Sequence, residues 1–139
     1  MSTETNKLVA RRFFEAFDRS DWDAMPALLS DDIKAHTAGM PGPMDRQSFE
    51  GFGRAFADAF SQSRHVVLSQ VAEGDQVATR GEWSAVNTGP FNGMPATNRP
   101  VKVDMTVFDT IRDGKIVEHR AIFDMATMMG QLGAIPAAA

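Results

Sequence analysis

The stretch from Val101 to Gly133 constrains the fold more than any other part of the chain. It contains two runs of alternating apolar residues on either side of Asp113-Gly114, followed by a short helical segment. Asp-Gly between two such runs is the strongest short-range signal for a β-hairpin with a two-residue turn. We therefore expect a strand, a tight turn, a second strand and a helix. The densest group of ionisable residues falls here, so any chemistry is expected against this sheet.

The remaining pattern predicts helices over residues 5–18, 22–29 and about 46–60, with Thr5 or Asn6 capping the first. A short extended piece is expected at 31–36 and strands at 65–71 and 76–86. Helices separated from a run of antiparallel strands indicate an α+β fold. A curved antiparallel sheet wrapped over helices leaves a cavity between the layers, where a ligand would bind. Residues 134–139 are expected to fray.

Composition narrows the classes of function. The 139 residues are 43% hydrophobic, which predicts one domain, 1–139, with a proper core. A net charge of -4 without a basic block argues against nucleic acid and anionic membrane surfaces as partners. No apolar run is long enough to span a bilayer and the N-terminus lacks a signal-peptide core, so we expect a cytoplasmic protein. The sequence has no cysteine and no tyrosine, which excludes disulfides, thiolate chemistry and a phenolic proton donor.

Simple register arithmetic separates the hairpin residues into two faces. A two-residue loop at 113–114 pairs positions whose numbers sum to 227, which places Asp104 opposite Phe123 and Phe108 opposite His119. Asp104 and His119 would then share one face, and Arg120 and Asp124 the other. A β-bulge would reverse this assignment, because one extra residue moves every following side chain to the opposite face.

Three histidines offer imidazoles that titrate near neutral pH. His36, at the end of the first extended piece, and His119 are candidates for proton transfer, although His36 could equally be a surface or hydrogen-bonded structural residue. His65 has no acidic neighbour in its strand and is interpreted as structural. The spacing of the three predicts no metal site.

Aromatic residues supply candidates for substrate binding. Four phenylalanines repeat at helical spacing in the third helix, and a core face is favoured over a ligand wall. Trp83 could be sheet core or a ligand platform. Phe108 and Arg120 are further candidates, while Arg120 could instead form a surface ion pair with Asp124. The long loop at 87–98 is typical of a lid or binding loop.

The chain resembles the SnoaL-like polyketide cyclases of the NTF2-like superfamily. The resemblance covers nearly the whole chain and depends on the order and spacing of several short motifs. The matching residues are Phe13-Phe14 with Phe17, Gly74-Asp75 with Val77 and Arg80, Gly89-Pro90-Phe91-Asn92-Gly93 with Pro95-Ala96-Thr97, Asp113-Gly114-Lys115-Ile116 with Glu118, Asp124, and Gln131-Leu132-Gly133.

The resemblance implies an NTF2-like α+β cone, with a curved antiparallel sheet wrapped around N-terminal helices, in a homodimer or higher homo-oligomer. It also implies cofactor-free acid–base chemistry on a small apolar carbonyl compound, in which a carboxylate removes an α-proton and the enolate closes a ring by aldol attack. Such a base works best where apolar surroundings raise its pKa. Family members often carry Trp-Asp where this chain has Arg120-Ala121.

Two hypotheses follow. The first is a cofactor-independent cyclase or isomerase in which Asp124 or Asp104 is the base and His36 and His119 assist. Asp124 could also cap the last helix, with Thr127 three residues on. The second is a non-catalytic protein that binds a small molecule in the same cone, which the loss of Trp-Asp favours.

Overall fold

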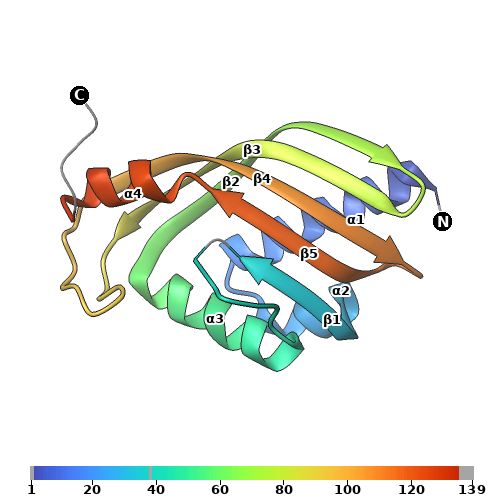
Figure 1. Ribbon diagram of the computed structural model, residues 1–139, viewed down its shortest axis with the longest axis horizontal. Helices are drawn as coiled ribbons and strands as arrows, with labels where there is room; N and C mark the ends of the chain where they lie inside the picture. Colours follow the sequence, from blue (N-terminus) through green and yellow to red (C-terminus); the bar gives the residue numbers. More distant parts are fainter. Residues whose placement is uncertain (1, 38, 135–139) are drawn as a thin grey trace.

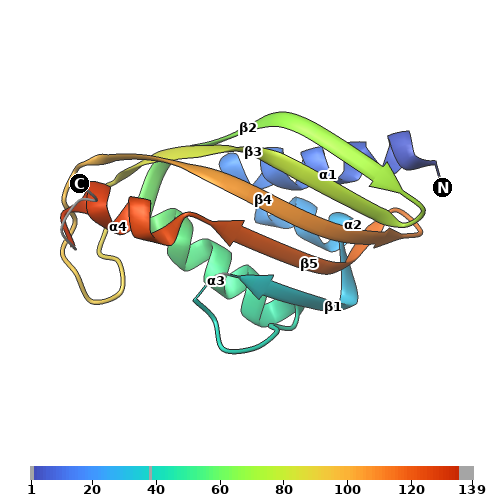
Figure 2. The same ribbon diagram turned by 45° about the horizontal axis from the view of Figure 1, so that its top comes forward.

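The computed structural model describes residues 2–37 and 39–134. A five-stranded sheet, in the order β1-β5-β4-β3-β2, curves over helices on its concave side. Figures 1 and 2 show the long helices α1 and α3 beneath the curved strands, while α4 lies at one end of the sheet. The α+β cone expected from the sequence is confirmed. Apart from Ala134, the tail expected to fray lies outside the described residues.

The first half of the chain supplies the helical layer. It contains α1 (Thr3–Asp18), a 3₁₀ turn (Trp22–Ala24), α2 (Met25–Leu28) and α3 (Arg46–Ala59). Ser2 caps α1 by accepting a hydrogen bond from the Thr5 N–H, so the expected cap at Thr5 or Asn6 was wrong. Asp45 caps α3 through the Ser48 N–H, as its preference for this position predicts.

The strands are longer than the sequence pattern predicted. They are β1 (Leu29–Thr37), β2 (Phe60–Glu73), β3 (Gln76–Asn87), β4 (Pro100–Arg112) and β5 (Lys115–Phe123), followed by α4 (Met125–Leu132). Phe60 begins β2 and does not continue α3, so the helical stripe has three phenylalanines. β1 pairs in parallel with β5, whereas the other neighbours are antiparallel. The parallel pairing brings residues from the start of the chain beside the last strand.

The β4–β5 hairpin turns where the sequence predicted. Asp113 and Gly114 both have positive φ, at 53° and 77°, as a type I′ turn requires. Arg112 pairs with Lys115 and Ile111 with Ile116, in agreement with the arithmetic, but the register then shifts so that Thr110 pairs with Glu118. Val117 is therefore the extra residue of a β-bulge. The predicted pairing of Asp104 with Phe123 is wrong, because Met105 takes that place.

Two hydrophobic clusters fill the space between sheet and helices. The larger lies under α1, where Val9, Phe13 and Phe14 pack against the concave face, and the smaller surrounds Trp83 and Met128 near α4. Burial of each large apolar side chain contributes about 1.5–3 kcal/mol. Within the described residues, no helix has the length and apolar character needed to cross a membrane. Residues of both clusters, among them Phe13 and Met128, also line one cavity.

Candidate functional site

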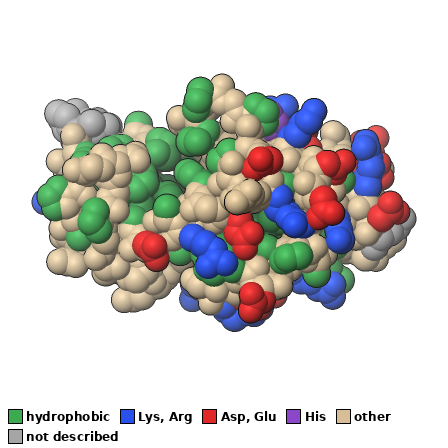
Figure 3. All heavy atoms as spheres, turned by 90° about the horizontal axis from the view of Figure 1, so that it is seen from below, with side chains coloured by type: hydrophobic (Ala, Val, Ile, Leu, Met, Phe, Trp, Pro, Cys, Tyr) green, Lys and Arg blue, Asp and Glu red, His purple; other side chains and the backbone are tan. Residues whose placement is uncertain are grey.

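An apolar cavity of about 180 Å³ lies between the concave face of the sheet and helices α1 and α3. Aromatic rings form most of its wall; those from the two helices are Phe13, Phe14, Phe17, Phe49, Phe52 and Phe56. Figure 3 shows hydrophobic side chains gathered around a hollow toward one end of this face, whereas charged side chains occupy much of the other end. The phenylalanines of α3 thus pack with the core, as the sequence favoured, and also line the cavity.

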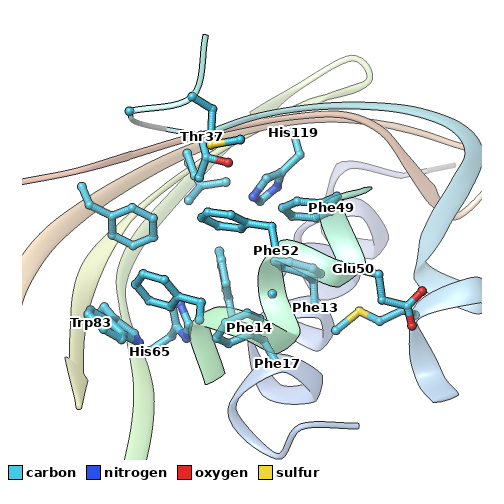
Figure 4. Close-up of a pocket in the computed structure, with 18 of the residues that line it drawn as sticks. Phe13, Phe14, Phe17, Thr37, Phe49, Glu50, Phe52, His65, Trp83 and His119 are labelled. Carbon is cyan, nitrogen blue, oxygen red and sulfur yellow. The ribbon is translucent and has the colours of Figure 1, made fainter. Parts of the chain in front are cut away.

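His119 faces this cavity from β5 and is oriented by a buried carboxylate. Its Nδ1 lies 2.6 Å from Oδ1 of Asp109 on β4, and the two side chains are 4% and 0% exposed. When Asp109 is ionised, its carboxylate can only accept hydrogen bonds, so the proton of a neutral imidazole in this pair is on Nδ1 and its lone pair is on Nε2. Among the described residues, no hydrogen-bond partner competes for Nε2. Figure 4 shows the imidazole among the aromatic rings.

The β-bulge places His119 on the inner face. Beyond Val117 the register pairs Asp109 with His119 and Val107 with Ala121, and all four of these residues are buried. The rings of Phe13 and Phe49 lie 5.0 and 5.2 Å from the imidazole, measured between ring centroids. Water is therefore excluded from most of the imidazole, which strengthens its interaction with Asp109.

Two buried oxygens at or near this pair have no hydrogen-bond partner in the part of the chain that the structure describes. They are Oδ2 of Asp109 and Oγ1 of Thr37. Thr37 is the last residue of β1, the strand that pairs with β5. Ala35 of β1 pairs with His119, so Thr37 lies two residues further along β1, opposite Ala121. An unsatisfied buried polar group costs about 1–3 kcal/mol, and such groups are expected where a ligand completes the hydrogen bonding.

A second histidine that lines the same cavity, His65, is also paired with a carboxylate. Nδ1 of His65 lies 2.7 Å from Oδ1 of Asp18, and the His65 backbone N–H donates to Oδ2 of Asp18 at 2.8 Å. The Ser63 hydroxyl also donates to Asp18, and Nε1 of Trp83 donates to Ser63. His65 was interpreted from sequence as structural without an acidic partner; its partner comes from α1, far away in the chain.

The structure does not bring the two predicted carboxylate bases to the cavity. Asp104 is exposed on the outer face of β4, opposite Glu82. Asp124 is exposed and caps α4, accepting hydrogen bonds from the N–H and hydroxyl of Thr127. Both bonds lower the pKa of Asp124, and the bond from the Thr127 hydroxyl has the larger effect. The expected base, a carboxyl group whose pKa is raised by apolar surroundings, is therefore not found at Asp124. The cap predicted as its alternative role is present.

Three other candidates lie on the outer face. His36 is half-buried and pairs in register with Arg120. Nε of Arg120 donates to Glu118 at 3.1 Å, so the ion pair suggested with Asp124 is replaced by one with Glu118. Phe108 is 50% exposed. The bulge explains the placement of Arg120, because it turns this side chain away from the concave face and pairs Arg120 with Phe108.

Trp83 and His119 are the predicted site residues that do line the cavity. The residues that sequence reasoning missed are Asp109, Thr37, Asp18 and the role of His65. One signal could have revealed Asp109. Every second residue from Val101 to Ile111 is apolar except Asp109, and a carboxylate within such an inward-facing series needs a buried partner. In the described part of the chain, no three His, Asp or Glu side chains gather as metal ligands would.

Comparison with known proteins places this geometry in a family. The sequence model of the SnoaL-like polyketide cyclases matches residues 7–132. No protein with a curated function matches significantly. Solved structures with the same fold include IdmH, a proposed polyketide cyclase from Streptomyces antibioticus, at 32% identity over 92% of this chain and 98% of that one, with a TM-score of 0.82.

Two further structures are similar over nearly their whole length. AclR from Streptomyces galilaeus, a proposed hydroxylase, is 25% identical and gives a TM-score of 0.88, covering 99% of this chain and 87% of its own. A proposed SnoaL-like polyketide cyclase from Jannaschia is 21% identical, with a TM-score of 0.87 and coverage of 96% and 95%, and shows the fold alone. Because the family model spans residues 7–132, the chain belongs to the SnoaL-like polyketide cyclase family.

Proposed function

We propose that the protein is a cofactor-independent enzyme that removes a proton next to the carbonyl group of a small apolar, polyketide-like substrate, leading to aldol-type cyclisation or isomerisation. The observation that carries the proposal is the buried His119–Asp109 pair on an aromatic cavity. An imidazole whose Nδ1–H is held by a carboxylate has a free lone pair on Nε2, which is the arrangement of a general base. The family membership and the likeness to IdmH support the substrate class.

In the proposed step, Nε2 of His119 accepts the α-proton and the electrons of the broken C–H bond pass into the enolate. Asp109 keeps the ring in the productive tautomer and stabilises the imidazolium that forms. The Thr37 hydroxyl, which has no hydrogen-bond partner within residues 2–37 and 39–134, is a candidate donor to the enolate oxygen. The aromatic wall binds the apolar part of the substrate and limits water. The chemistry requires only side chains that the site already contains.

Hydrogen–deuterium exchange tests the proposal without knowledge of the natural substrate. The bicyclic ketone α-tetralone in deuterium oxide loses its α-proton signals in proton NMR at a rate that reports proton abstraction. We expect the protein to accelerate the exchange and His119→Asn to lower the acceleration by about 100-fold or more. Asparagine keeps a nitrogen near the position of Nδ1, so it can still bind Asp109 while it removes Nε2.

The same assay separates the competing hypotheses. Asp104→Asn and Asp124→Asn are matched controls, because the two carboxylates were the bases expected from sequence; loss of exchange in either would transfer the role of base to that residue. If α-tetralone raises the melting temperature of the protein but its exchange is no faster than in buffer, the second hypothesis, a non-catalytic binding protein, replaces the proposal.

A further inference from the structure

The His65–Asp18 pair has no role in the proton abstraction described above. His65 nevertheless lines the same cavity as His119, and its side chain is 7% exposed. With Nδ1 bound to Asp18, only Nε2 is available to the cavity, and no described residue hydrogen-bonds to it. His65 therefore does more than form part of the cavity wall, because a ligand bound in the cavity would contact its Nε2.

The two imidazoles lie at separate ends of the cavity. The His119 ring packs on Phe13, at 5.0 Å between ring centroids, whereas the His65 ring stacks on Phe14, also at 5.0 Å. Phe13 and Phe14 are themselves neighbours at 5.8 Å. Figure 4 shows His119 and His65 on opposite sides of the aromatic rings. A ligand that contacts both nitrogens must therefore present two reactive atoms that are not adjacent.

The two carboxylates act differently on their imidazoles. Asp18 accepts three hydrogen bonds, from the Ser63 hydroxyl, the His65 backbone N–H and Nδ1 of His65. Asp109 accepts one, from His119, and its Oδ2 has no partner among the described residues. The two imidazoles are thus held differently. His119 is fixed by its ring alone, whereas His65 is fixed to Asp18 through both its ring and its backbone N–H.

We propose that His65 is a second catalytic residue, the proton donor for an atom remote from the one that His119 deprotonates. This inference rests on the proposed function and narrows it to closure of a carbon–carbon bond between two carbonyl groups. After His119 forms the enolate, the enolate carbon bonds to the second carbonyl carbon and the C=O electrons move to its oxygen. Nε2–H of His65 protonates that alkoxide. His119 ends with one proton more and His65 with one fewer, and exchange with water restores both.

A structural role for His65 is the competing explanation, since Asp18 joins the end of α1 to β2 through Ser63 and His65. The variant His65→Asn separates the two roles. The amide nitrogen of asparagine can replace Nδ1 as the donor to Asp18, but asparagine has no titrating group in the place of Nε2. Urea unfolding of the variant measures how much of the structural connection it retains.

Two probes distinguish this inference from the proposed function. Exchange of α-tetralone needs His119 but has no step for His65, whereas cleavage of a fluorogenic naphthyl β-hydroxyketone, the reverse of bond closure, needs both groups. In cleavage, His65 takes the hydroxyl proton and His119 returns a proton to carbon. We expect His65→Asn to lower cleavage by about 100-fold and to lower exchange far less, so that the ratio of the cleavage rate to the exchange rate falls by more than about tenfold. His119→Asn should lower both.

Other outcomes overturn the inference. It fails if His65→Asn leaves cleavage unchanged, if it lowers exchange and cleavage equally, or if the wild type exchanges α-tetralone without cleaving the β-hydroxyketone. In the last case the proposed function survives.

Should His65→Asn not fold, the pH profiles of cleavage and exchange in the wild-type protein test the inference. Asp18 is the charged group in contact with His65 among the described residues. Cleavage should depend on two ionisations and exchange on one; a single ionisation in both profiles would contradict the second catalytic role.

Discussion

The concave and convex faces of the β4–β5 hairpin carry different kinds of ionisable group. On the concave face, His119 and Asp109 are buried, paired at 2.6 Å and surrounded by aromatic rings. On the convex face, Asp104 is exposed and Arg120 forms an exposed pair with Glu118. Exposed pairs contribute about 0–1 kcal/mol, whereas a buried pair interacts in a medium that screens it poorly. The difference is the reason for assigning the proposed chemistry to the concave face, the one with fewer charges.

The largest effect is expected from deletion of Val117, the extra residue of the bulge. Without it, the residues that follow would exchange faces, burying Arg120 and Ile122 and exposing His119. An unpaired buried charge together with a lost core contact costs more than about 4 kcal/mol, so the variant should not fold cooperatively in urea titrations. Val117→Ala, which keeps the bulge, is the control. A deletion variant as stable as the wild type would show that the bulge does not determine which side chains of β5 point toward the concave face.

Asp109→Asn should reduce proton abstraction without unfolding the protein. Asparagine can donate to Nδ1 and so stabilise the tautomer whose Nε2 is protonated and cannot act as a base. We expect the rate of α-tetralone exchange to fall by about 100-fold or more. The control variant Asp104→Asn, on the convex face, should exchange α-tetralone at the wild-type rate. Equal rates in wild type and Asp109→Asn would mean that the concave pair is only structural.

Thr37→Val should make the protein more stable and the exchange slower. The valine removes a buried hydroxyl that has no partner among the described residues, which is expected to raise the free energy of unfolding by about 1 kcal/mol. If the substrate is the missing partner, the same change weakens the stabilisation of the enolate. Thr37→Ser keeps the hydroxyl and should preserve the exchange rate. A less stable valine variant would indicate that the hydroxyl has a partner in solution.

The smallest effect is expected from Asp124, which lies outside the cavity. Hydrogen bonds from Thr127 lower the pKa of its carboxyl below the ordinary value of 3.8. The stabilisation from this shift is fully present above the ordinary value and is lost as the pH falls through the lowered one. The stability difference between wild type and Asp124→Asn should thus be constant above a pH of about 5 and shrink in acid. A difference that grows in acid would contradict the assignment of Asp124 as a charged cap.

Much of the architecture could be predicted from sequence because it depends on local patterns. The Asp113-Gly114 turn needs positive φ at both residues, and the stripes of α1 and α3 repeat at helical spacing, so these features are visible in short windows. Element ends were less predictable: Phe60 fits the helical stripe, but pairing with Asn87 draws it into β2. Local propensity cannot show such a tertiary preference.

The site was harder to predict because it depends on pairing. Val117 looks like any strand residue, yet as a bulge it decides that His119 points inward and Arg120 outward. The partner of His65 lies 47 residues earlier in the chain, so no window around His65 contains it. Resemblance to the family directed attention to Asp124 as a base; the sequence also suggested its role as a cap, but its exposure is visible only in the structure. His119 and Trp83 were predicted as site residues and line the cavity, whereas Asp109 was not predicted.

The tautomer and ligand response of His119 test the account most directly. In nitrogen-15 NMR of the labelled histidines, we predict that neutral His119 carries its proton on Nδ1, and that α-tetralone shifts its Nε2 resonance while His36 on the convex face does not respond. A proton on Nε2 of neutral His119, or a response at His36 with none at His119, would contradict the assignment of the concave imidazole as the base.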